Sequence, residues 1–175
     1  MRSKMLFVVV AALAGLSAHS QQKPAPIAEQ SCRKFVQSFY DWYVPRILNS
    51  ASTYEQVLNG KASSSFSTSL LRQLRVDYAA AKANPNEVVG LDFDPFLNSQ
   101  DPSETFKVTQ VKVAGVKCSA EVRGIAGGVS DEEVHPELML VNGGWQFVNF
   151  RYQQNTDLLS MLKTLREQRQ KAAGR

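Results

Sequence analysis

The chain has 175 residues, of which 43% are hydrophobic and 21% are charged, and it contains two cysteines. This length suits one domain with a hydrophobic core, and the composition excludes a disordered chain, a collagen-like chain and a small scaffold held by many disulfides. Twenty Lys and Arg residues against 16 Asp and Glu residues give a formal net charge of +4. We therefore expect one ordinary globular domain.

The first 20 residues have the three zones of a secretory signal peptide. Arg2 and Lys4 precede an apolar run over residues 5–14, and small residues lead up to Ser20. This run is shorter than the roughly 20 residues that cross a bilayer. We predict cleavage near Ser20 and a periplasmic or secreted product without a stable membrane anchor. The alternative, a buried N-terminal helix, does not account for the order of the zones.

The positive charge is concentrated at the two ends of the chain. Cleavage of the predicted leader removes two basic residues and no acidic one. Five more basic residues lie within the last 13 residues: Lys163, Arg166, Arg169, Lys171 and Arg175. The rest of the mature chain is slightly acidic. Binding to a phosphate backbone requires a basic face, so we do not expect nucleic acid as a partner.

The first half of the mature chain is predicted to be mostly helical. Apolar residues follow helical spacing over 35–43, where Pro45 limits the helix, and again over 70–81, where Asn84 and Pro85 end it. Residues 21–29 are expected to be a flexible lead-in and residues 166–175 a basic polar tail. Residues 30–165 then form the single domain.

The second half changes to the alternating pattern of strands. Residues 89–93 and 116–122 alternate apolar with polar, and the phase slips near Thr109, as a β-bulge would cause. Asn142 and Gly143 predict a tight hairpin turn. The strand that follows, residues 145–152, is apolar on both faces, so we place it in the middle of a covered sheet.

A last helix is expected after Asn155 or Thr156, either of which can cap it. Helices that precede an antiparallel meander give an α+β fold rather than a parallel α/β fold.

Three segments resemble the cone-shaped superfamily of nuclear transport factor two, which includes SnoaL-like proteins and ketosteroid isomerase. They are residues 38–43, 90–102 and 144–150, and the second also resembles an exported bacterial family known only as a domain of unknown function. The resemblance covers about residues 30–162. It implies N-terminal helices packed on a strongly curved antiparallel sheet with a C-terminal helix. The mouth of such a cone can hold a ligand, but the superfamily contains enzymes, binders and scaffolds.

The acidic loop over residues 92–101 has two interpretations. Its carboxylates and amides could surround a hard cation, but the spacing is not that of a calcium-binding loop. The favoured interpretation is a turn in which Asp94 and Asp101 accept hydrogen bonds from backbone amides while Phe93 and Phe96 pack inward. We therefore predict no metal.

An enzyme of this fold would use Asp92 or Asp94 as a general base, with Tyr40 or Tyr43 as the hydrogen-bond donor to an oxyanion, as in ketosteroid isomerase. The catalytic pattern of that enzyme does not match this chain. Motifs for zinc, for phosphate and for a dinucleotide do not occur either, so no cofactor is predicted. A protein that is not an enzyme is therefore favoured.

A ligand in the cone would meet Tyr40, Trp42, Asp92, Asp94 and Asn149. Asn149 is placed there because strand alternation puts it on one face with the aromatic side chains of residues 145 and 147. The alternative for each aromatic residue is the core.

Cys32 and Cys118 are predicted to form a disulfide between the first helix and a strand. An exported chain enters an oxidising compartment, where a disulfide persists. The alternative is two buried thiols that act as small hydrophobic side chains.

We expect an exported, non-catalytic module that binds a small apolar ligand or a protein partner. The two alternatives are the small cone-fold enzyme described above and an inhibitor or immunity-type protein directed against an exported toxin or hydrolase. The sequence leaves open whether the sheet forms a homodimer.

Overall fold

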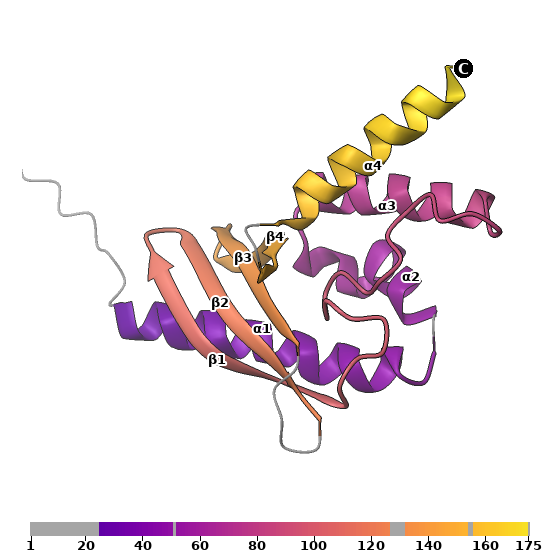
Figure 1. Cartoon of the computed structure of the whole chain (residues 1–175). Coiled ribbons are helices and arrows are strands. Elements are labelled where there is room, and N and C mark those ends of the chain that lie inside the picture. The colour runs from indigo at the N-terminus through magenta and orange to yellow at the C-terminus, as the bar shows by residue number, and fades with distance from the viewer. Residues whose placement is uncertain (1–24, 51, 127–131, 154–155, 175) are drawn as a thin grey trace, which may run out of the picture.

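The structure, a computed structural model, describes residues 25–50, 52–126, 132–153 and 156–174. Helices come first, a four-stranded antiparallel sheet follows, and a helix ends the chain (Figure 1). This order confirms the predicted α+β class. The elements are α1 (Ala25–Ile47), α2 (Ser52–Asn59), the 3₁₀ helix η1 (Lys61–Ser65), α3 (Thr68–Ala83), β1 (Thr105–Ala114), β2 (Lys117–Ile125), β3 (Glu133–Val141), β4 (Gly144–Arg151) and α4 (Leu158–Ala173).

The sheet has the order β1-β2-β3-β4, and α1 lies along one of its faces (Figure 1). The pairing shifts between Val108 and Gln110, at the bulge that the sequence predicts. The turn between β3 and β4 has positive φ at Asn142 and Gly143, 50° and 83°, which confirms the predicted hairpin. The β3–β4 hairpin is therefore closed by a tight turn, and the bulge in β1 adds to the bend of the sheet.

The core lies between α1 and the sheet and is rich in aromatic residues. Val36, Tyr40 and Tyr43 from α1 are almost fully buried, as are Phe147 and Phe150 from β4. The ring of Phe39 packs against rings from α1, the 94–99 loop and β4. Burial of such rings is the main source of stability in a domain of this size.

A disulfide joins Cys32 in α1 to Cys118 in β2, as predicted. Both cysteines are buried, with 0% and 3% of their surface exposed. The bond closes a loop with a sequence separation of 86 and fixes α1 on the sheet. Disulfides persist mainly in oxidising compartments, which agrees with a location outside the cytoplasm.

The expectation that residues 145–152 lie in the middle of the sheet is wrong, because β4 is an edge strand. Glu137 pairs with Asn149 and Leu138 pairs with Phe147, so Val148 is an extra residue in β4. This bulge turns Phe147 and Phe150 toward the same buried face. The apolar residues that suggested two covered faces of this strand thus include two aromatic residues on a single buried face.

Residues 89–93 do not form a strand, contrary to the prediction. The backbone amide of Leu91 donates to Asp77 in α3 rather than to a neighbouring strand. Gly90 fits against α3, where an added Cβ would lie 3.0 Å from both Ala81 Cβ and Asp77 Oδ2. The segment is therefore a loop held against a helix.

Two helices are longer than predicted. Helix α1 begins at Ala25, within the expected flexible lead-in, and continues past Pro45 to Ile47. Helix α4 begins after Asp157, whose side chain accepts from the amide of Ser160, and continues to Ala173 through most of the expected polar tail. Pro45 has no amide hydrogen to donate to the carbonyl group of Asp41, and the helix ends two residues after it.

The predicted leader falls within residues 1–24, which lie outside the described residues. Within the described ranges, no helix combines the length and apolar character needed to span a membrane.

Candidate functional site

The loop after α3 contains a half-buried carboxyl group, Asp94, that faces α1. Its Oδ2 atom accepts a 2.7 Å hydrogen bond from the Tyr43 hydroxyl. Its Oδ1 atom accepts from the backbone amides of Phe96, at 2.8 Å, and Leu97, at 3.2 Å. The sequence predicted the backbone-amide contacts of Asp94, but it assigned the Tyr43 hydroxyl to a substrate oxyanion rather than to this carboxyl group. Asp94 therefore starts a turn and ties that turn to α1.

The environment of this pair favours neutral groups. Burial raises the pKa of Asp94 from 3.8 to about 6, although the hydrogen bonds from Tyr43 and from the two amides act in the opposite direction. Burial also raises the pKa of Tyr43, and the nearby charge of Asp94 raises it further. Tyr43 thus keeps its proton and acts as a donor at all ordinary pH values.

Two other tyrosines hold the same loop. Tyr40 donates to the carbonyl oxygen of Phe96 at 3.0 Å, and Tyr152 donates to that of Pro95 at 2.8 Å. Tyr40 is 1% exposed and Tyr152 is 8% exposed. Their hydroxyl protons are directed at the protein's own backbone, where buried polar groups need partners. These hydroxyls therefore fix the position of the loop in the core.

The structure places Asn149 on the opposite face of β4 from Trp145 and Phe147. The prediction that these three residues share one face is therefore wrong. The bulge at residue 148 reverses the alternation at that point. The Asn149 side chain donates to Glu137 and Asp157 and accepts from the amide of Leu159. It therefore joins the sheet to the start of α4.

Asp92 and Trp42 lie at the surface, in two separate grooves. Asp92 is exposed and lines a largely apolar groove of about 400 Å³ between residues 88–93 and α4. Trp42 lines a groove of about 330 Å³ with Phe35 and Ala62. The five residues expected to share one ligand site are thus divided among the core, the open side of β4 and two surface grooves.

No three His, Cys, Asp or Glu side chains converge as metal ligands in the described part of the chain. In the acidic loop, the carboxyl group of Asp94 is directed inward to Tyr43 and to backbone amides, whereas Asp101 is exposed. The loop therefore folds around the carboxyl group of Asp94, and its acidic side chains do not converge on one position.

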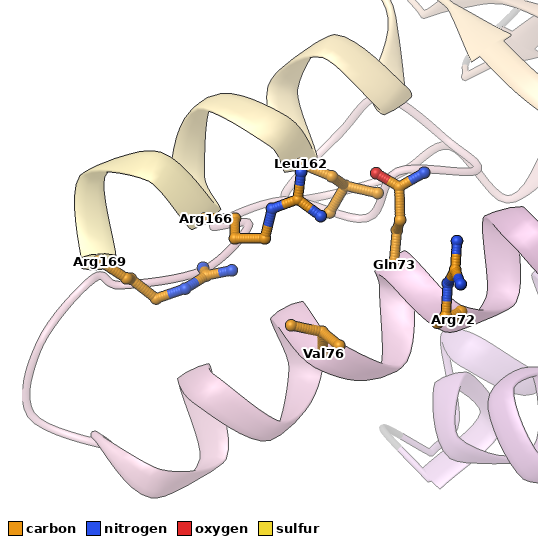
Figure 2. A pocket seen from close by; sticks show the side chains of 6 residues that line it. All are labelled: Arg72, Gln73, Val76, Leu162, Arg166 and Arg169. Carbon is orange, nitrogen blue, oxygen red and sulfur yellow. The ribbon is translucent and has the colours of Figure 1, made fainter. Parts of the chain in front are cut away.

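A third groove, of about 540 Å³, lies between α3 and α4. The helices pack against each other and diverge toward the C-terminus (Figure 1). Figure 2 shows Arg166 and Arg169 extending from α4 toward α3, with Arg72 and Gln73 on the facing helix. Val76 and Leu162 complete the lining. We call this feature the arginine groove.

One of its arginines has a structural partner. Arg169 Nη1 lies 2.6 Å from Asp77 Oδ1 and also donates to the carbonyl oxygen of Val89. The side chains of Arg169 and Asp77 are 20% and 4% exposed, so this ion pair is largely buried. It joins α4 to α3 and to the 88–93 loop beside the arginine groove.

The other two arginines are available to a ligand. Arg72 and Arg166 are exposed, and neither takes part in an ion pair among the described residues. Sequence analysis missed this groove because it took residues 166–175 as a tail. The signal was present in the helical spacing of Leu162, Arg166 and Arg169, which are four and three residues apart.

Neither a scan against protein-family models nor a search of curated proteins finds a match to this chain. Solved structures do show the same fold. A chain of the type VI native effector-immunity complex Tae3-Tai3 from Ralstonia pickettii is 24% identical, with a TM-score of 0.55 over 72% of this chain and 98% of that chain. The selenomethionine form of the complex gives 22% identity and a TM-score of 0.50 over 71% of this chain and 97% of that one.

Proposed function

We propose that this protein is an exported, non-catalytic binding module of the effector-immunity kind, which protects by binding a protein partner. The observation that carries the proposal is a difference between two sets of polar side chains. Those in the core bond to the protein itself, whereas those of the arginine groove are open to a partner. The core groups Asp94, Tyr43 and Tyr40 are bound to one another or to the loop backbone. Arg72 and Arg166 of the arginine groove are exposed, and no ion pair among the described residues includes them.

The contrast argues against the cone-fold enzyme. A general base must reach a proton on the substrate, and an oxyanion donor must be directed at the substrate. Asp94 and Tyr43 are directed at each other, and Tyr40 is directed at the Phe96 carbonyl group. A substrate could use these groups only after the 94–97 loop had left α1. A structural role for these residues needs no such rearrangement.

The fold supports a partner of this kind. Nearly the whole length of a chain from an effector-immunity complex aligns with residues of this protein. The cone-shaped superfamily suggested by the sequence remains part of the proposal, as the origin of a bent sheet with α1 on one face.

Export is supported by the predicted leader together with the disulfide. The 24 residues that precede α1 contain the basic, apolar and small-residue zones of a signal peptide. The buried Cys32–Cys118 bond suits an oxidising compartment. A binder of this kind would therefore meet its partner in the periplasm or outside the cell.

The experiment is a protection assay. Each candidate type VI effector of the source organism is directed to the periplasm of a host that also produces the full chain with its leader. We expect one effector to be neutralised and to co-purify with the chain in a stoichiometric complex. The matched control lacks residues 1–20 and should not protect. The proposal fails if no effector binds and the purified protein instead retains a small ligand in native mass spectrometry.

A further inference from the structure

The arginine groove contains like charges that nothing in the described structure neutralises. Arg72 is on α3 and Arg166 is on α4, and both line the same groove. Two positive charges that line one groove attract a negatively charged group that enters it. Two ion pairs involve α4, and neither includes Arg72 or Arg166: Arg169 pairs with Asp77, and Lys163 pairs with Glu167 outside the groove lining. The arrangement is therefore prepared for a negatively charged occupant.

We propose that the arginine groove is the docking site for an acidic segment of the protein partner. This inference rests on the proposed function and names the surface and the chemistry of its partner. Carboxylates on such a segment would pair with Arg72 and Arg166, since a guanidinium group binds a carboxylate through two parallel hydrogen bonds. Gln73 adds a donor and an acceptor for the backbone or an amide of the segment.

The apolar lining indicates a peptide segment rather than a free anion. Val76 is 50% exposed, and Leu162 lies at the base of α4 with 3% exposed. Charged side chains in one groove with an exposed apolar side chain match a segment with acidic and apolar residues. A small inorganic anion would leave Val76 in water.

The groove between the two helices argues against a membrane. Lipid phosphates lie in a plane, whereas Arg72 and Arg166 lie on two different helices that line a groove. Membrane-bound helices instead present basic and apolar residues on an outward face. A narrow protein segment can enter the groove, whereas a bilayer surface contacts only its edges.

The chain itself does not offer the occupant. Residues 1–24 contain no Asp or Glu, and residues 127–131 contain one acidic residue, Asp131. The remaining undescribed positions, 51, 154–155 and 175, are uncharged or basic. The residues outside the described ranges therefore supply no acidic segment, and we assign the segment to the protein partner.

The test uses a fluorescein-labelled peptide of alternating Glu and Leu residues, and a control peptide in which Gln replaces every Glu. Binding of the exported protein is measured by fluorescence anisotropy at low and at physiological salt. The double variant Arg72→Gln/Arg166→Gln should bind the acidic peptide at least about tenfold more weakly than the wild type. The matched control, Lys163→Gln/Lys171→Gln, removes the same charge from α4 outside the groove and should bind within about twofold.

Nuclear magnetic resonance gives a second readout that does not depend on variants. The Nε–Hε signals of Arg72 and Arg166 should shift on titration with the acidic peptide and not with the Gln peptide. Equal affinity of wild type and Arg72→Gln/Arg166→Gln would overturn the proposal. Arginine-dependent capture by phosphatidylglycerol vesicles without peptide binding would overturn it in favour of a membrane. A homodimer lost in the same variant would overturn it in favour of self-association.

The protection assay separates this inference from the proposed function. If Arg72→Gln/Arg166→Gln neutralises the effector as well as the wild type does, the groove is not the docking site and the proposed function stands. If the wild type binds no effector, the proposed function fails. The peptide assay then decides separately whether the arginine groove binds acidic segments.

Discussion

The Tyr43 hydroxyl donates a 2.7 Å hydrogen bond to Asp94, and this contact joins α1 to the loop that leads into the sheet. The other carboxyl oxygen of Asp94 accepts from two backbone amides of the same loop. A residue pair that resembles the parts of an acid–base site is therefore used to hold a turn in the core. The predictions below test this structural role, the disulfide and the position of α4.

Replacing Asp94 with Asn should remove a pH dependence of stability. The folded protein holds the Asp94 proton more tightly than the unfolded chain does, because burial raises its pKa from 3.8 to about 6. The resulting stabilisation is complete below about pH 4 and is lost as the pH rises through about 6. The free energy of unfolding of the wild type, relative to Asp94→Asn, should fall by about 3 kcal/mol over that range.

Urea denaturation at a series of pH values measures this difference. Asn keeps an oxygen that can accept from the amides of Phe96 and Leu97, so the variant should fold. A difference between the two proteins that stays constant with pH would contradict the structural assignment of Asp94.

Replacing Tyr43 with Phe should destabilise the protein by about 2 kcal/mol near neutral pH, because it removes a hydrogen-bond donor from the charged, half-buried Asp94. The effect should shrink below pH 6, where Asp94 is protonated. Tyr40→Phe is the matched control, since Tyr40 donates to a neutral carbonyl oxygen. Its effect should be about 1 kcal/mol and independent of pH. The same pH profile for both variants would be inconsistent with the contacts described.

Removing the disulfide by the double substitution Cys32→Ala/Cys118→Ala should lower the free energy of unfolding. The sequence separation of 86 corresponds to about 4 to 5 kcal/mol in the loop-entropy description. The wild type treated with a reductant under denaturing conditions and then refolded is the control and should show a similar loss. Mass spectrometry of the exported protein should find no free thiol, and two alkylated cysteines would show that the bond does not form.

Breaking the buried ion pair between Asp77 and Arg169 should release α4. Asp77→Asn leaves the guanidinium of Arg169 without its countercharge, and removal of one member of a buried pair costs about 3 kcal/mol or more. Hydrogen exchange in residues 158–173 should accelerate more than exchange in the sheet. Glu167→Gln removes only an exposed pair with Lys163 and should leave exchange unchanged. Equal exchange in α4 for the wild type and Asp77→Asn would rule out the role given to this pair.

Local patterns predicted most elements of the fold. The helical spacing before Asn84, the alternation around Cys118, the phase slip near Thr109 and the Asn142–Gly143 turn each depend on neighbouring residues, and each is present in the structure. The disulfide was predictable because a helix and a strand each offered one cysteine on an apolar side.

The errors arose where contacts distant in sequence decide the structure. The bulge at Val148 depends on its pairing with β3, and it moved Asn149 to the other face. The Leu91 amide is bound by Asp77, so a strand-like pattern became a loop. Arg169 forms an ion pair with the same Asp77, and helix α4 continues through residues that were expected to be a polar tail. None of these partners is visible from the local sequence.

The most direct test of the account compares three proteins for binding to the effector that the protection assay identifies: the wild type, Asp94→Asn and Arg72→Gln/Arg166→Gln. Isothermal titration calorimetry should give Asp94→Asn the affinity of the wild type and Arg72→Gln/Arg166→Gln an affinity at least about tenfold weaker. Loss of binding or of protection in Asp94→Asn, with full function in the arginine variant, would show that the active part of the molecule is its core rather than its surface.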